Sequence, residues 1–169
     1  CSSLQSITIP QSVTDIGRAF EGCSSLASIA IPESVTVIGI SAFQDCRSLE
    51  SITMTQSVTA IGNFAFLGCS CLKSISIPDS VTVIGDSAFA NCCSLASITI
   101  PQSVTAIGDR AFFGCESLES IRIPESVTEI GDSAFSHCKS STSITLPESV
   151  TSFGDGASDD KFPAKRRKV

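Results

Sequence analysis

The sequence contains no tryptophan and no tyrosine, and His137 is its single histidine. Tryptophan and tyrosine are the side chains that most often anchor protein interfaces, and histidine is the most frequent general base. The chain is therefore poorly supplied for acid–base catalysis. It also has no apolar run near the roughly 18 residues that a membrane-spanning helix requires, and no charged-then-apolar leader at its start.

The composition nevertheless favours a folded domain, because 42% of the 169 residues are hydrophobic. Opposite charges are segregated along the chain. The residues before Lys161 include 17 acidic and 6 basic side chains, a charge of −11, whereas residues 161–169 include 5 basic side chains and no acidic one. The first residue is Cys1 rather than Met, which is typical of a fragment or a processed product.

Most cysteines belong to an internal repeat, with one interval of 22 residues followed by five of 23. The repeated pattern is C-x-x-L-x-S-I-x-I-P-x-S-V-T-x-I-G-x-x-A-F-x-x-C. A repeat of this length predicts a solenoid of six full coils and one degraded coil. The periodic cysteines are Cys1, Cys23, Cys46, Cys69, Cys92, Cys115 and Cys138.

Each copy divides into three short pieces. In the second copy, SIAIP alternates small polar residues with Ile, which predicts a half-buried strand that Pro ends. SVTVIG indicates a second extended piece, and SAFQDC predicts one helical turn with Phe43 and Cys46 pointing inward. We expect the Gly after each Ile to mark a sharp turn with φ > 0. Stacking at about 4.8 Å per coil would join the apolar faces into one core.

The residues L-x-x-I-x-I-P-x-S-V-T-x-I-G-x-x-A-F-x-x-C resemble the BspA-like class of leucine-rich repeats, close to the treponemal class, over residues 1 to about 157. The resemblance implies an α/β repeat solenoid: a right-handed superhelix, mostly parallel β, with a parallel sheet on a concave face. It also implies a non-enzymatic adhesion or protein-binding role, often at the surface of bacteria and protists. Fold transfers within such a family better than ligand does.

Three coils depart from the pattern. The first is one residue short, at IGRAFEGC, so we expect its turn to be tighter. In the third coil, Met54 and Thr55 replace Ile-Pro, and in the last coil Ser141, Phe153 and Ser158 replace Leu, Ile and Phe. Polar substitution at the end of a stack is typical of a terminal cap.

The first coil shows no such cap, since Leu4, Ile7 and Ile9 keep its apolar character. We expect this edge to be unshielded. It would then be covered by further coils that precede Cys1, or would self-associate.

The nine cysteines admit structural, metal-binding and catalytic interpretations. The periodic ones are expected to be small buried hydrophobes. Cys71 and Cys93 lie outside the period, and their C-S-C and C-C spacings do not match the C-x2-C pairs of zinc sites. His137 precedes Cys138, but adjacent residues on a short turn should diverge. We therefore predict no catalytic residue, no metal and no cofactor.

An aspartate follows the periodic Gly in four coils, as Asp86, Asp109, Asp132 and Asp155. These side chains predict capping carboxylates near helix N-termini, or together an acidic stripe. A calcium ladder would require more oxygen ligands per coil than one aspartate supplies.

Each strand of the predicted sheet exposes two residue positions. One is always Ser, and the other is mostly Ser or Thr. Such a face is either simply solvated or makes weak polar contacts with protein or glycan. Its specificity would come from Glu50, Lys73, Glu119 and Arg122.

A second candidate surface is the slot after the periodic Phe, which is apolar only in the three central coils. We predict a docking edge formed by Phe64, Leu67, Ala90 and Phe113, because contiguous exposed apolar residues mark partner sites. The alternative is that these side chains pack beneath the adjacent turns and extend the hydrophobic core.

The repeat ends near residue 157, and residues 158–169 form a basic tail that we expect to be disordered. Lys165, Arg166, Arg167 and Lys168 resemble a nuclear localisation signal. Nucleic-acid binding is disfavoured, because the acidic body would repel phosphate. The family resemblance implies a surface or secreted location, whereas a functional tail would imply an intracellular or nuclear one.

Three function hypotheses follow. The first is a binding scaffold, either an adhesin or an adaptor, with a protein partner. The second is a structural spacer within a longer repeat array. The third, an enzyme that uses Cys or His137, has the least support from the residues.

Overall fold

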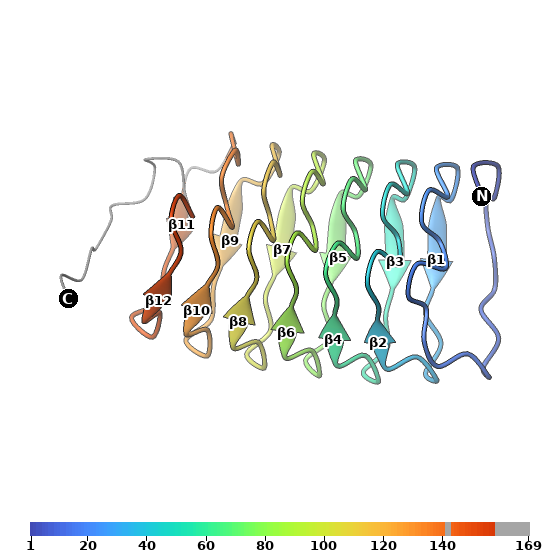
Figure 1. Ribbon diagram of the computed structural model, residues 1–169, viewed down its shortest axis with the longest axis horizontal. Helices are drawn as coiled ribbons and strands as arrows, with labels where there is room; N and C mark the ends of the chain where they lie inside the picture. The colour runs from blue at the N-terminus through green and yellow to red at the C-terminus, as the bar shows by residue number, and fades with distance from the viewer. Residues whose placement is uncertain (141–142, 158–169) are drawn as a thin grey trace.

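The computed structural model describes residues 1–140 and 143–157. They form a parallel β-solenoid whose coils stack side by side from the N-terminus to the C-terminus (Figure 1). We number the coils from each periodic Cys, so that the third coil is 46–68, the fourth 69–91 and the fifth 92–114. From Cys23 onward each coil contributes one three-residue and one two-residue strand.

The three-residue strands are β1 (Ser28–Ala30), β3 (Ser51–Thr53), β5 (Ser74–Ser76), β7 (Ser97–Thr99), β9 (Ser120–Arg122) and β11 (Ser143–Thr145). The two-residue strands are β2 (Val37–Ile38), β4 (Ala60–Ile61), β6 (Val83–Ile84), β8 (Ala106–Ile107), β10 (Glu129–Ile130) and β12 (Ser152–Phe153).

Each pair of bonded strands is parallel and joins equivalent residues of adjacent coils, as when Ile29 pairs with Ile52. The two-residue strands form one six-stranded sheet, whereas the three-residue strands form a two-stranded and a four-stranded sheet. The break lies between β3 and β5, beside Met54 and Thr55, where Ile-Pro is replaced. Because the register is constant, equivalent residues of successive coils lie in columns.

The segment before each periodic Cys is a run of turns, and the described residues contain no helix. The prediction of one helical turn per coil is therefore wrong. Ser41 has φ 54° and Asp45 has φ 57°, and this left-handed conformation interrupts a right-handed helix. Successive backbone amides of this segment alternate between two kinds of hydrogen bond. Gln44 N–H donates within its own coil, to the Ser41 carbonyl at 3.2 Å, whereas Phe43 N–H donates to the next coil, to the Ala65 carbonyl at 2.7 Å.

The core contains a continuous column of phenylalanine rings. Neighbouring rings are stacked, with centroids 5.2–5.4 Å apart and interplanar angles of 2–6°. Burial of each ring stabilises the fold by roughly 1.5–3 kcal/mol, and each ring from Phe43 to Phe135 lies between two coils. The column consists of Phe20, Phe43, Phe66, Phe89, Phe112 and Phe135.

A cysteine column lies beside the rings, and all its members from Cys23 to Cys138 are buried. This confirms the structural interpretation for every periodic cysteine except Cys1, which is exposed. From Cys46 onward each thiol donates to the carbonyl of the column Phe 26 residues earlier in the chain, at 3.0–3.3 Å. Burial, and secondarily the neighbouring Cys23, raises the pKa of Cys46 to about 12. These thiols are therefore structural donors rather than nucleophiles.

The periodic glycines are required by close approach rather than by φ. Positive φ occurs at other glycines, such as Gly22 and Gly68, so the expectation of φ > 0 at the periodic ones is wrong. A Cβ on Gly108 would lie 2.5 Å from Asp86 Oδ1 and 2.6 Å from the Gly85 carbonyl carbon. The glycine column therefore lets adjacent coils approach each other at this corner.

The first coil is less regular than the others. It contains no named strand and joins the even-numbered sheet through a single bridge from Asp15 to Val37. Ile7 is 42% exposed, as expected for an unshielded edge. Ile9 is 6% exposed and packs in the core, so its predicted exposure is wrong. At the other end, Phe153 is 42% exposed.

Candidate binding surfaces

The outward side chains of the three-residue strands form a surface that we call the hydroxyl face. In β1 to β9 the middle Ile is buried and the residues on both sides of it are exposed. The face is consequently rich in groups that both donate and accept hydrogen bonds. Its members are Ser28, Ala30, Ser51, Thr53, Ser74, Ser76, Ser97, Thr99, Ser120 and Arg122.

The four charged residues predicted to give this face its specificity lie on it or beside it. Glu50, Lys73 and Glu119 are exposed and immediately precede β3, β5 and β9, whereas Arg122 ends β9. Lys73 Nζ lies 3.5 Å from Glu50 Oε2 in the neighbouring coil. Exposed pairs of this kind contribute about 0–1 kcal/mol, so a partner could replace this one at low cost.

The predicted docking edge is only partly assembled. Phe64 is 39% exposed, and Leu67 and Phe113 are half-buried. Ala90 is 3% exposed, so its side chain adds no exposed area to this edge. The Phe113 ring stacks on His137, with centroids 4.8 Å apart, and this contact covers part of it. Phe64 is therefore the most accessible apolar side chain of the edge.

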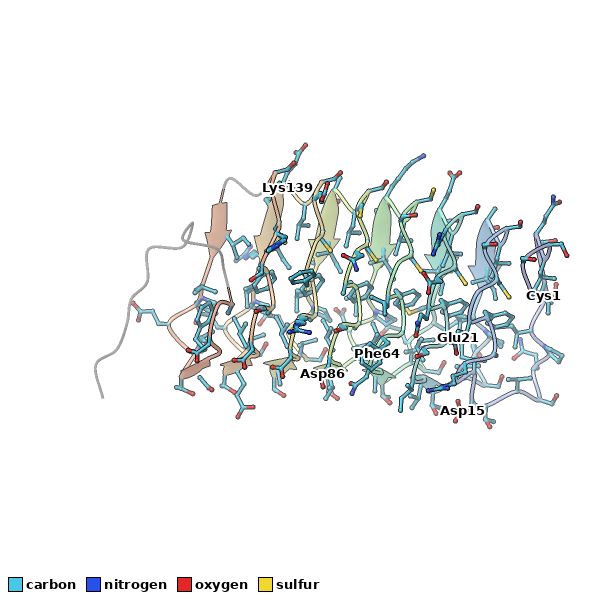
Figure 2. All side chains as sticks on the ribbon, turned by 45° about the horizontal axis from the view of Figure 1, so that its top comes forward. Cys1, Asp15, Glu21, Phe64, Asp86 and Lys139 are labelled. Carbon is cyan, nitrogen blue, oxygen red and sulfur yellow. The ribbon has the colours of Figure 1, made fainter. Side chains whose placement is uncertain are left out.

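Phe64 also has an unusual backbone conformation, which the sequence interpretation missed. Its φ is 60°, a region that bulky residues rarely occupy. The equivalent position is Ser41 in the second coil, Ser87 in the fourth and Arg110 in the fifth. The register imposes this conformation, since Phe64 N–H donates to the Asp86 carbonyl of the next coil at 2.8 Å. Figure 2 shows Phe64 near Asp86, far from Lys139 at the opposite edge of the stack.

The aspartates after the periodic glycines do not cap helices, and that prediction is wrong. The carboxylates of Asp86, Asp109 and Asp132 each accept the backbone N–H of the equivalent residue in the next coil, at 3.0, 2.8 and 2.7 Å. Asn63 begins this ladder by accepting from Asp86 N–H at 3.0 Å. The recurring acid therefore satisfies an amide at the corner that contains the glycine column.

A groove of about 320 Å³ adjoins this ladder. Its lining includes Val83, Ala106 and Glu129 from the even-numbered sheet, together with Asp86 and Asp109. In residues 1–140 and 143–157, no three His, Cys, Asp or Glu side chains are placed to hold a metal ion. The same residues include no helix long and apolar enough to cross a membrane.

The basic run of the tail, Lys165, Arg166, Arg167 and Lys168, lies outside the described residues, as do Ser141 and Ser158. Its interpretation as a nuclear signal stays a prediction.

The comparisons with known proteins agree with the stacked-coil geometry. A family model for the BspA type leucine-rich repeat region, present in 6 copies, matches residues 1–116 and 82–160. The chain is similar to the crystal structure of a Treponema pallidum leucine-rich repeat protein, at 35% identity and a TM-score of 0.86. That match covers 90% of this chain and 74% of the treponemal one.

A leucine-rich repeat protein from Bacteroides ovatus is similar at 40% identity and a TM-score of 0.88, over 93% of this chain but 41% of that one. The pneumococcal vaccine antigen PcpA shares the fold, at 22% identity and a TM-score of 0.62, over 89% of this chain and 41% of the antigen. No curated protein sequence matches the chain.

Proposed function

Because the chain belongs to the BspA-type leucine-rich-repeat family, we propose that it is a non-enzymatic scaffold that binds another protein, as an adhesin or an adaptor, through its solenoid surface. The hydroxyl face supports this proposal best. Its outward side chains are nearly all small, so the backbone of a partner can approach the strands closely. Serine and threonine hydroxyls then offer donors and acceptors to the partner.

The charged residues of the hydroxyl face would supply specificity. Lys73, Glu50 and Glu119 lie along one border, and Arg122 is the single charged member of the face itself. Charges at the rim of an interface mainly set the association rate and suppress wrong partners. A planar Arg guanidinium on a surface of small side chains is suited to bidentate contact with a partner carboxylate.

Site-specific photo-crosslinking tests the assignment. A photoreactive amino acid replaces Thr99 on the hydroxyl face, and in a matched control it replaces the exposed Thr105 before β8. Both proteins are irradiated with an extract of surface and secreted proteins. We expect one discrete adduct from position 99 only, and a lower yield when Arg122→Ser is added. Equal adducts from both positions would rule out the hydroxyl face, and no adduct from either would favour the structural spacer.

The edge around Phe64 is a second candidate, favoured by the 39% exposure of this aromatic side chain. We expect Phe64→Ser to lose partner binding without loss of stability, because serine occupies the same slot at Ser41 and Ser87. Leu67→Ser combined with Phe113→Ser should abolish capture with an unchanged far-ultraviolet circular dichroism spectrum. Undiminished capture by both proteins would exclude this edge.

A further inference from the structure

Cys71 and Cys93 differ from the cysteine column in both position and exposure. Cys71 is exposed and Cys93 is half-buried, whereas the column from Cys23 to Cys138 is buried. Both thiols are free in the structure. They lie in the fourth and fifth coils, which are adjacent in the stack.

The register places these two residues diagonally opposite each other. Ser74 pairs with Ser97, so three residues earlier Cys71 lies beside Ser94, the residue that follows Cys93. The stacking continues through this turn, because Ala96 N–H donates to the Lys73 carbonyl at 3.1 Å. One coil across, about 4.8 Å, and one residue along, about 3.8 Å, give a Cα separation of about 6 Å. Disulfides typically span about 4.4–6.8 Å between Cα atoms.

The serines equivalent to Cys93 show where its sulfur can point. Ser70 Oγ donates at 3.3 Å to the Arg47 carbonyl, which belongs to the equivalent residue of the preceding coil. A Cys93 side chain in the same rotamer would point at the Ser70 carbonyl, in the peptide that leads into Cys71. Cys93 Sγ now donates to the Asn91 carbonyl at 3.4 Å, and because a thiol is a weak donor, the loss of this bond would oppose the rotation only slightly. Cys71 is exposed and can rotate without displacing packed atoms.

We propose that Cys71 and Cys93 form a redox-active thiol pair that closes into a disulfide between the fourth and fifth coils, with a small-molecule disulfide as its oxidant. One protein thiolate attacks the small disulfide and expels one small thiolate. The second protein thiolate then attacks the resulting mixed disulfide and expels the other. Two protein thiols are thus oxidised, and one small disulfide is reduced to two thiols.

The disulfide would link the fourth and fifth coils covalently, next to the point between β3 and β5 where the sheet of three-residue strands is interrupted. A covalent link between coils restrains the unfolded chain and opposes separation of the coils. The oxidised protein should therefore unfold at a higher temperature than the reduced protein.

Peptide mapping tests the pair. The full reduced chain is treated with glutathione disulfide, alkylated and digested with trypsin without reduction. We expect the peptide that ends at Lys73 to be joined to the one that ends at Arg110. The mass of the joined product should be lower by two hydrogen atoms than the sum of the masses of the two separate peptides. Cys71→Ser and Cys93→Ser should each reduce this product to background, whereas Cys1→Ser should not change its yield.

A matched control moves one thiol by a single coil. Cys71→Ser combined with Ser48→Cys keeps the number of thiols but places the new one two coils from Cys93, about 10 Å away and beyond disulfide reach. This variant should give only glutathione adducts. The proposal is overturned if it links as well as the parent chain, if the single variants retain the link, or if the parent yields only glutathione adducts or intermolecular dimers.

Discussion

Two columns of side chains that are adjacent in the chain behave differently along the solenoid. In the first six coils every residue of the inner column is Phe, and its rings are buried and stacked 5.2–5.4 Å apart. In the outer column, one residue later, the side chains differ in size, charge and exposure: Glu21, Gln44, Leu67, Ala90, Phe113 and Ser136. An inner ring must fit two neighbouring coils at once, so its identity is restricted. An outer side chain meets fewer constraints, and differences between coils can be used to recognise a partner.

The largest expected effect is in the inner column. Phe89→Ala should lower the free energy of unfolding by about 3–5 kcal/mol, because it leaves a cavity between two rings in the middle of the stack. Phe113→Ala in the outer column of the next coil should cost less than half as much, since that ring is half-buried. Urea unfolding followed by circular dichroism measures both. Equal losses of unfolding free energy in the two variants would contradict the difference in burial between the inner and outer columns.

The glycine column offers a second comparison. Gly108→Ala should cost about 1–3 kcal/mol, because the new Cβ would overlap the Asp86 carboxylate and the backbone of the preceding coil. At Gly17 the nearest atom to a new Cβ is Asp15 Oδ1 at 3.4 Å, and the next nearest, Gly39 Cα, is 4.0 Å away. Gly17→Ala should therefore change the unfolding free energy by less than about 0.5 kcal/mol. Thermal melts of the two variants check the difference.

The cysteine column predicts an alkaline loss of stability. The pKa of Cys46 is raised from 9.0 to about 12 in the folded protein, chiefly by burial. Above pH 9 the unfolded chain loses this proton while the folded chain keeps it, so stability falls between about pH 9 and 12, by up to about 1.4 kcal/mol per pH unit. Cys46→Ala should unfold with a shallower pH dependence over this range. An unchanged slope would show that this thiol ionises equally in both states.

The smallest effect is expected in the aspartate ladder. Asp109→Asn should change the unfolding free energy by less than about 0.5 kcal/mol, because an amide oxygen can accept the Asp132 N–H as the carboxylate does. The chain already uses this substitution at Asn63. Asp109→Ala removes the acceptor and should cost about 1 kcal/mol. A similar loss in both variants would indicate that the charge matters more than the hydrogen bond.

The fold could be predicted from periodicity, and the candidate surfaces only in part. The alternation around Ile29 and Ile52 predicts strands with one buried face, and the structure has them. The exposure of Phe64 and the burial of Ala90 could not be predicted. Both lie on turns, where neither a strand nor a helix period applies, and their exposure depends on the coils on either side.

By itself, the 23-residue spacing determined that equivalent residues would stack and that the Ile, Val, Phe and Cys slots would be internal, because only that arrangement buries every apolar face. Only the tertiary structure decided the backbone conformation of the turns that connect the strands. Hydrogen bonds between residues 23 apart, such as Asp109 N–H to Asp86 Oδ1, replaced the local bonds of a helix. A local pattern cannot predict such bonds, since their partner lies in the next coil.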